Sequence, residues 1–156
     1  MKRIFLIVLC CVLTFISVNA AKRPNVVFFL VDNMGWRDVG CFGSSFYDTP
    51  NIDRLAKQGV KFTNAYAACH VCSPTRASIM TGKYPGRLNL TDWLSGRRDF
   101  AFQRLLSAEK LQALPLKEVT LAEALKANGY RTGIFGKWHL GNEQAGPLSQ
   151  GFDVQI

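Results

Sequence analysis

The 156-residue chain is long enough for one modest domain and too short for two well-packed ones. Hydrophobic residues make up 48% and charged residues 19%, which is typical of a globular rather than a disordered protein. Two histidines exclude a zinc site built from three histidines, and five cysteines are too few for a disulfide-dense mini-protein. The formal net charge of +8 favours anionic partners or substrates.

The N-terminal segment has the pattern of a signal peptide. Two basic residues precede the apolar residues 4–16, and residues 18–20 (VNA) end in the small residue that signal peptidase requires. The apolar run is shorter than the about 20 residues of a membrane span, although an N-terminal anchor helix is the alternative. We expect a signal peptide at 1–20, a mature portion at 21–156, and export to the periplasm, the exterior or a eukaryotic secretory and lysosomal route. Export disfavours nucleic acid as a partner, and no stable membrane span is expected.

Strands and helices alternate in the first half of the remaining chain. Residues 25–31 (NVVFFLV) form a continuous apolar run after the first residue, which is typical of a strand buried on both faces of a parallel sheet. Thr49-Pro50-Asn51 opens a helix with one apolar face, and Gly59 ends it. Residues 60–67 are predicted to form another strand.

The second half continues the same alternation. Ser73-Pro74 opens a helix that ends at Gly82, with proline in the first turn. Residues 83–119 carry little pattern, apart from a weak helical signal at 102–111. A capping box at 120–123 (TLAE) opens a helix that ends at Asn128-Gly129, and residues 130–135 follow as a strand. This order predicts an α/β fold with a mostly parallel sheet flanked by helices.

Ligands of such sheets bind at the carboxyl ends of the strands, where three polar clusters are expected. Asp32 and Asn33 offer adjacent oxygen ligands for Ca²⁺ or, less favourably, Mg²⁺, although both residues are common in ordinary turns. Lys137 and His139 are two apart on an extended segment and point to one side, where a cation and an imidazole can bind an anion and move a proton. A chance pair on a loop is the alternative.

The third cluster lies at the start of a helix. Cys72 precedes Pro74, so free backbone N–H groups and the helix dipole attract anions there, and Arg76 lies one turn further on. This arrangement suits a tetrahedral oxyanion, whereas a buried cysteine with a surface arginine is the alternative. Cys69 and Cys72 also form a C-x-x-C pair, which permits a redox couple or a disulfide of Cys69 with Cys72 or Cys41.

Four segments resemble the type I sulfatases, of the formylglycine-dependent, arylsulfatase-like kind. Residues 72–82 (CSPTRASIMTG) resemble the first sulfatase signature and residues 129–139 (GYRTGIFGKWH) resemble the second. Residues 24–36 resemble the opening strand and metal turn of that family, and residues 47–56 match a further segment. The resemblance covers nearly all of residues 23–153 and implies the N-terminal part of the alkaline-phosphatase-like α/β fold.

The resemblance implies a mechanism for sulfate ester hydrolysis. A maturing enzyme would convert Cys72 to formylglycine, whose hydrated aldehyde attacks sulfur and later expels sulfate. Arg76 would hold the formylglycine hydroxyls, Lys137 would bind a sulfate oxygen, and His139 would help to deprotonate the hydroxyl that ejects sulfate. Asp32, Asn33 and the oxygen at position 72 would bind Ca²⁺.

Three features depart from the family pattern. Asn33 stands where a second aspartate is usual, which removes one negative charge from the metal site, and His70 stands where a small residue is usual. The chain resembles only roughly the first third of a sulfatase, because further metal and substrate ligands lie downstream in the family. We therefore expect a truncated reading frame, and a fragment that is inactive alone.

Other functions remain compatible with these residues. A formylglycine-dependent phosphate or phosphonate monoester hydrolase uses a similar tetrahedral anion, a non-catalytic module would only bind sulfated glycans, and an exported redox protein would use the C-x-x-C pair. Trp93, Arg97 and Arg98 are candidates for sugar contacts, with a solvated loop as the alternative. Asn89-Leu90-Thr91 is a glycosylation sequon if the source is eukaryotic.

Overall fold

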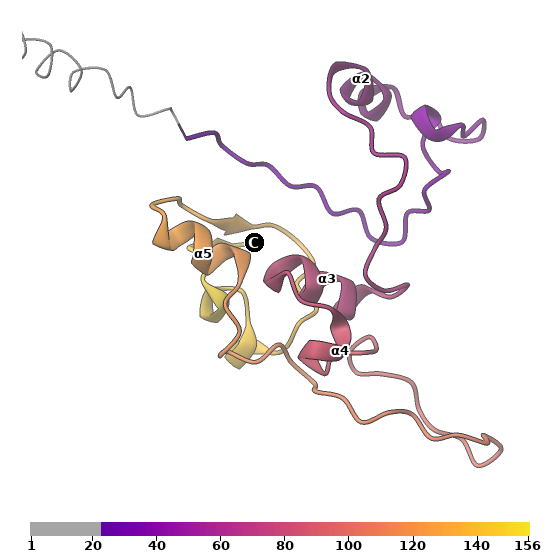
Figure 1. Ribbon diagram of the computed structural model, residues 1–156, viewed down its shortest axis with the longest axis vertical. Coiled ribbons are helices and arrows are strands. Elements are labelled where there is room, and N and C mark those ends of the chain that lie inside the picture. Colours follow the sequence, from indigo (N-terminus) through magenta and orange to yellow (C-terminus); the bar gives the residue numbers. More distant parts are fainter. Residues whose placement is uncertain (1–22) are drawn as a thin grey trace, which may run out of the picture. The chain divides into compact units, whose positions relative to one another are not determined.

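The computed structural model describes residues 23–156 (Figure 1), which divide into two units: residues 23–34 belong to the first and residues 35–156 form the second. The predicted signal peptide at 1–20 lies outside the described residues. In the first unit, the predicted strand at 25–31 is wrong, because the segment is extended without strand pairing and Phe29 is 83% exposed. A strand exists only beside a hydrogen-bonded neighbour, and residues 23–34, the described part of this unit, provide none.

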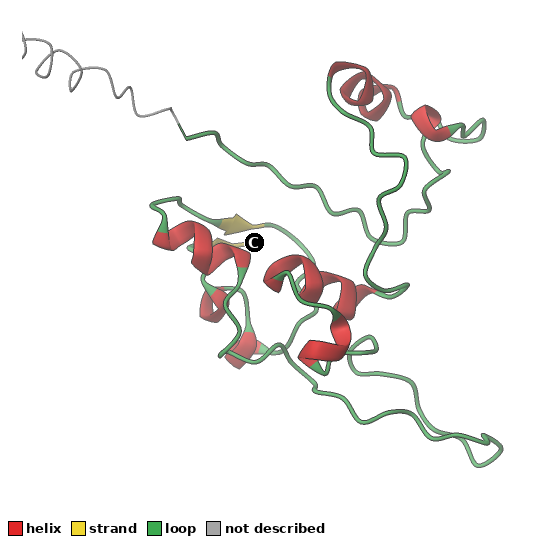
Figure 2. Cartoon of the chain, viewed as in Figure 1, coloured by secondary structure: helices red, strands yellow, loops and turns green. Residues whose placement is uncertain are grey.

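The second unit contains short helices, two strands and long loops (Figure 2). In chain order the elements are η1 (Gly40–Phe42), α2 (Pro50–Gln58), α3 (Cys72–Thr81), α4 (Pro85–Leu88), α5 (Leu121–Ala127), β1 (Gly133–Ile134), η2 (Glu143–Ala145), η3 (Leu148–Gln150) and β2 (Val154–Gln155).

The predicted helix α2 is confirmed, with the start and end that its terminal residues indicate. Thr49 is the N-cap, Pro50 is the first helical residue and Gly59 follows the last. The Asp53 carboxylate accepts a hydrogen bond from the Cys41 backbone N–H at 2.6 Å and one from the Thr49 hydroxyl at 3.1 Å. These bonds join α2 to η1, although no residue of α2 is buried.

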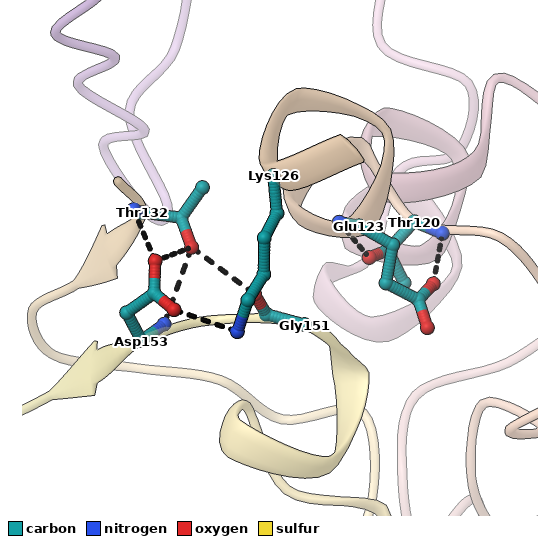
Figure 3. Close-up of polar contacts among 6 residues, drawn as sticks. All are labelled: Thr120, Glu123, Lys126, Thr132, Gly151 and Asp153. Carbon is teal, nitrogen blue, oxygen red and sulfur yellow. Dashed lines mark hydrogen bonds and ion pairs between the residues drawn. The ribbon is translucent and has the colours of Figure 1, made fainter. Parts of the chain in front are cut away.

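Helices α3 and α5 are also confirmed. Gly82 ends α3 in the left-handed conformation, with φ 68°, which a residue without Cβ adopts at no steric cost. At the start of α5, the Glu123 backbone N–H donates to the Thr120 hydroxyl and the Thr120 backbone N–H donates to the Glu123 carboxylate (Figure 3). This reciprocal capping box satisfies two of the N–H groups that a helix start leaves without helical partners.

The two strands form a parallel pair in which Gly133 is opposite Val154 and Ile134 is opposite Gln155. Side-chain interactions next to the strands support this pairing (Figure 3). The Asp153 carboxylate accepts a hydrogen bond from the Thr132 backbone N–H at 2.8 Å and forms an ion pair with the Lys126 ammonium at 2.6 Å. Lys126 and the Thr132 N–H hold the pKa of Asp153 at about 2, below its usual 3.8. The predicted strand at 130–135 is therefore present but shorter.

Two further predictions in this unit are wrong. Residues 60–67 form no strand, and Phe62 and Tyr66 are exposed. Residues 102–111 form a loop instead of a helix, with Leu105 exposed at 82%. In both segments the apolar side chains have no packed surface to cover, and most of the stability of a short helix or strand comes from such packing.

The core of this unit lies between α3, α4 and the segment that follows β1. Its buried members are Ala77, Leu88, Leu90, Leu114, Trp138 and Leu140, against which Met80, Leu94, Ile134 and Phe152 pack. The Trp138 indole N–H donates to the Ala145 carbonyl at 2.9 Å, and its ring meets Phe152 edge to face. Because Trp138 lies between Lys137 and His139, this packing fixes the segment that carries both predicted site residues.

Candidate functional site

Cys72 is the first residue of α3, at the position that the sequence predicts for an anion-attracting helix terminus. Its side chain is half-buried, and the Thr75 hydroxyl donates to the Cys69 carbonyl at 2.7 Å, which fixes the turn leading into the helix. Ser73 and Pro74 are buried next to it, so the start of α3 is firmly packed. Position 72 is thus held by a rigid element and remains accessible.

Arg76 joins α3 to the segment after β1. Its Nη1 donates to the Lys137 backbone carbonyl at 2.5 Å, and the arginine is only 8% exposed. The structure therefore brings the side chain of Arg76, a residue of the helix that begins at Cys72, to the backbone of Lys137, 61 residues further along the chain. A buried guanidinium in this helix is a cation suited to binding a tetrahedral anion.

His139 is held by one ring nitrogen. Its Nε2 lies 2.7 Å from the Leu94 carbonyl oxygen, and a carbonyl only accepts, so Nε2 carries the proton. The other nitrogen, Nδ1, is buried and has no hydrogen-bond partner among residues 23–156. In this tautomer Nδ1 carries a lone pair, which is the state required to take up a proton.

A second side chain holds the same peptide unit at Leu94. The Leu94 backbone N–H donates to the Ser73 hydroxyl oxygen at 3.0 Å, and Ser73 is fully buried. Ser73 and His139 thus form hydrogen bonds with the backbone N–H and the carbonyl of Leu94. These bonds connect the loop that contains Leu94 to the start of α3. The sequence gives no periodic signal for this contact, which spans 21 residues on one side and 45 on the other.

The predicted metal ligands Asp32 and Asn33 belong to the first unit, so the structure does not place them relative to Cys72. Both lie in a turn, and Asn33 adopts the left-handed conformation with φ 59°. One carboxylate and one amide oxygen fit a hard cation, which takes about six to eight oxygen ligands in the case of Ca²⁺. Within residues 23–156 no group of three or more His, Cys, Asp or Glu side chains is close enough to hold a metal ion.

The three described cysteines are free thiols, so neither disulfide that the sequence permits is formed. The Cys69 sulfur lies 3.8 Å from Nδ1 of the exposed His70. No helix in the described part of the chain has the length and apolar character needed to cross a bilayer.

A cavity of about 880 Å³ opens beside the start of α3. It is lined by His70 and Val71, which directly precede Cys72, and by residues of the loop 91–112. Trp93 and Arg97, two of the three candidates for sugar contact, line it, whereas Arg98 does not. The Ser107 side-chain and backbone donors hold the pKa of Asp99, at the rim, below its usual value.

The family model described as Sulfatase matches residues 24–155. Steryl-sulfatase from Homo sapiens is 45% identical over 123 residues, which are 79% of this chain and 20% of that protein. Arylsulfatase A from Homo sapiens is 40% identical over 135 residues, which are 85% of this chain and 24% of that protein.

Two solved structures are similar in fold. Ps i-CgsB in complex with a neocarrahexaose has a TM-score of 0.66 and 37% identity over 78% of this chain and 25% of its own. A protein described with glycosaminoglycan metabolism by Bacteroides thetaiotaomicron has a TM-score of 0.69 and 35% identity over 86% of this chain and 28% of its own. The chain spans about a quarter of the length of these relatives. The predicted α/β fold, the N-terminal part of the alkaline-phosphatase-like architecture, is confirmed.

Proposed function

The chain belongs to the sulfatase family, and from this premise we propose that the complete gene product hydrolyses sulfate monoesters of aryl or carbohydrate type. The observation that carries the proposal is the contact of the buried Arg76 guanidinium, in the helix that begins at Cys72, with the backbone of Lys137. This places a positive charge in a helix whose N-terminus also attracts anions. A sulfate ester offers the matching tetrahedral anion.

In the proposed reaction, the nucleophile derives from Cys72. A maturing enzyme uses an external oxidant such as molecular oxygen to convert this side chain to the aldehyde of formylglycine, with the sulfur leaving as sulfide. The hydrated aldehyde supplies one hydroxyl to attack the ester sulfur and another to release sulfate. The ester oxygen departs with the alcohol or phenol. Arg76 orients the diol and Lys137 binds a sulfate oxygen. The Nδ1 atom of His139 accepts the proton from the second hydroxyl, whose deprotonation releases sulfate. Nε2 is not available for this role because it is hydrogen-bonded to the Leu94 carbonyl.

We assign the metal to Asp32, Asn33 and the oxygen at position 72. Ca²⁺ suits this donor set better than Mg²⁺, and it would neutralise charge on the sulfate. Asparagine contributes a carbonyl oxygen without the charge of aspartate. The Asn33→Asp variant is therefore expected to bind Ca²⁺ more tightly, as measured by calorimetric titration of both proteins. Equal affinities would remove Asn33 from the ligand set.

The decisive experiment expresses the complete gene product with and without a formylglycine-generating enzyme. Hydrolysis of 4-nitrophenyl sulfate should require that enzyme, and the mass of the peptide containing position 72 should show the aldehyde. Cys72→Ala should abolish turnover. An unmodified thiol together with full turnover would refute the proposal, and faster hydrolysis of 4-nitrophenyl phosphate would assign the site to phosphate esters instead.

The same expression experiment tests whether the protein is exported. We propose that residues 1–20 direct export and are removed, because the basic start, short apolar run and small final residue fit signal peptidase. N-terminal sequencing of exported material should begin at Ala21. An N-terminus that retains the apolar run would favour the anchor helix.

A further inference from the structure

The cavity beside α3 is built into the same framework as the proposed active site. Trp93 and Ser95, which line it, flank Leu94 in the chain. Leu94 is gripped by Ser73 at its N–H and by His139 at its carbonyl. The hydrogen bonds to Ser73 and His139 therefore hold this part of the cavity wall in place. Leu94 and its neighbours belong to the long loop between α4 and α5 (Figure 1).

The cavity lining also includes the residue directly before the proposed nucleophile. Val71 lines the cavity and is the N-cap of α3, directly before Cys72. The cavity therefore adjoins the residue before position 72, where the leaving group of an ester held at that position can reach it. The volume of about 880 Å³ lies within the range of small-molecule sites, about 300–1,000 Å³, and exceeds what a single sulfate needs.

The lining is polar and carries an aromatic face. The Trp93 side chain is 40% exposed, so its ring is available for packing, and Thr91 and Gln112 add uncharged hydrogen-bonding groups. This combination suits a sugar ring, whose C–H face packs on an aromatic ring while its hydroxyls bind amides and hydroxyls.

The charges at the cavity favour a neutral sugar. Three acidic side chains (Asp92, Asp99 and Glu109) outnumber two basic ones (Arg97 and Lys110). Hydrogen bonds occupy part of the capacity of both signs: Lys110 donates to the Ser95 carbonyl at 3.2 Å, and Asp99 accepts from the Ser107 backbone N–H and hydroxyl. An acidic sugar would meet net repulsion here, whereas a neutral one would find donors and acceptors of both kinds.

We propose that this cavity binds a neutral sugar unit of the leaving group, and that the natural substrate is a sulfated oligosaccharide with uncharged neighbouring sugars. The inference rests on the proposed sulfatase function. Trp93 is the main contact, and Gln112 binds the ring hydroxyls.

The test compares substrates with the matured, complete gene product. The probes are 4-nitrophenyl sulfate, singly sulfated galacto-oligosaccharides of one to six units, and sulfated glycosaminoglycan oligosaccharides with uronic acids. In the wild type, kcat/KM should be highest for the longer neutral oligosaccharides. Trp93→Ala should lower the ratio of kcat/KM for the hexasaccharide to that for 4-nitrophenyl sulfate by about tenfold or more, and Trp93→Phe should retain most of it.

Phe102→Ala is the matched control, because Phe102 lies on the same loop, is 82% exposed and does not line the cavity. Its ratio should equal that of the wild type. Gln112→Ala should lower the ratio too, and it replaces Trp93→Ala if that variant does not fold. Absence of all sulfate ester hydrolysis would overturn the proposed function. Aryl sulfate hydrolysis without a preference for neutral oligosaccharides, or with a preference that survives both substitutions, would overturn the cavity inference alone.

Discussion

The hydrogen bond between Ser73 and Leu94 offers the sharpest test of the site framework. Ser73→Ala removes the acceptor of the Leu94 N–H at a position where Ser73 is fully buried and the distance is 3.0 Å. Leaving a buried donor without its partner costs about 1–3 kcal/mol. The ratio of folded to unfolded protein should therefore fall by about 5- to 160-fold.

Helix α3 itself provides the control. The Ser78 hydroxyl oxygen is also buried, yet it has no hydrogen-bond partner within the described residues. Ser78→Ala makes the same chemical change without breaking a bond, so the free energy of unfolding should stay within about 0.5 kcal/mol or rise. Urea unfolding of the complete gene product, followed by tryptophan fluorescence, measures both. Equal losses in the two variants would refute the assigned hydrogen bond.

Three further perturbations test other parts of the second unit. Leu140→Ala removes a fully buried core side chain and should cost about 2–5 kcal/mol in urea unfolding, whereas Leu116→Ala at an exposed position should cost under about 0.5 kcal/mol. Thr120→Ala removes the α5 cap and should cost about 1 kcal/mol by the same assay; an unchanged midpoint would contradict the cap. Lys126→Met should raise the Asp153 pKa from about 2 toward 3.8, as an NMR titration would show; a pKa that stays near 2 would contradict the ion pair. Because the folded-state pKa is the lower one, the stability that Asp153 contributes is present above pH 3.8 and is lost as the pH falls toward 2, so the variant should lose part of it.

The helices were predictable because their signals are local. Pro50 at the start of α2, Gly82 at the end of α3 and the capping box of α5 each act within a few residues. Strand formation depends on a partner elsewhere in the chain. The apolar runs at 25–31 and 60–67 have the right composition, yet they lie extended and exposed, whereas the less conspicuous β1 pairs with β2 some 21 residues later.

The candidate site likewise contains residues that the sequence predicts and residues that only the structure reveals. Arg76, Lys137 and Cys72 lie in segments with recognisable motifs; Arg76 and Cys72 share helix α3, and the Arg76 side chain contacts the Lys137 backbone. Ser73 and Leu94 act through a backbone peptide in a loop without periodicity, which local pattern cannot reveal. The relation of Asp32 to these residues stays a prediction of the family resemblance, since the two units are described separately.

The two hydrogen bonds to the Leu94 backbone also explain how one loop can serve both the proposed catalysis and the proposed recognition of the sugar. The bonds to Ser73 and His139 use the backbone N–H and carbonyl, so they do not depend on the side chain at position 94. That side chain packs against the core instead. Loop residues beyond this anchor, such as Trp93 and Gln112, are therefore able to vary with the leaving group while the geometry at position 139 stays fixed. In the proposed reaction, substrate range can therefore change in the cavity without disturbing His139, the proposed proton acceptor.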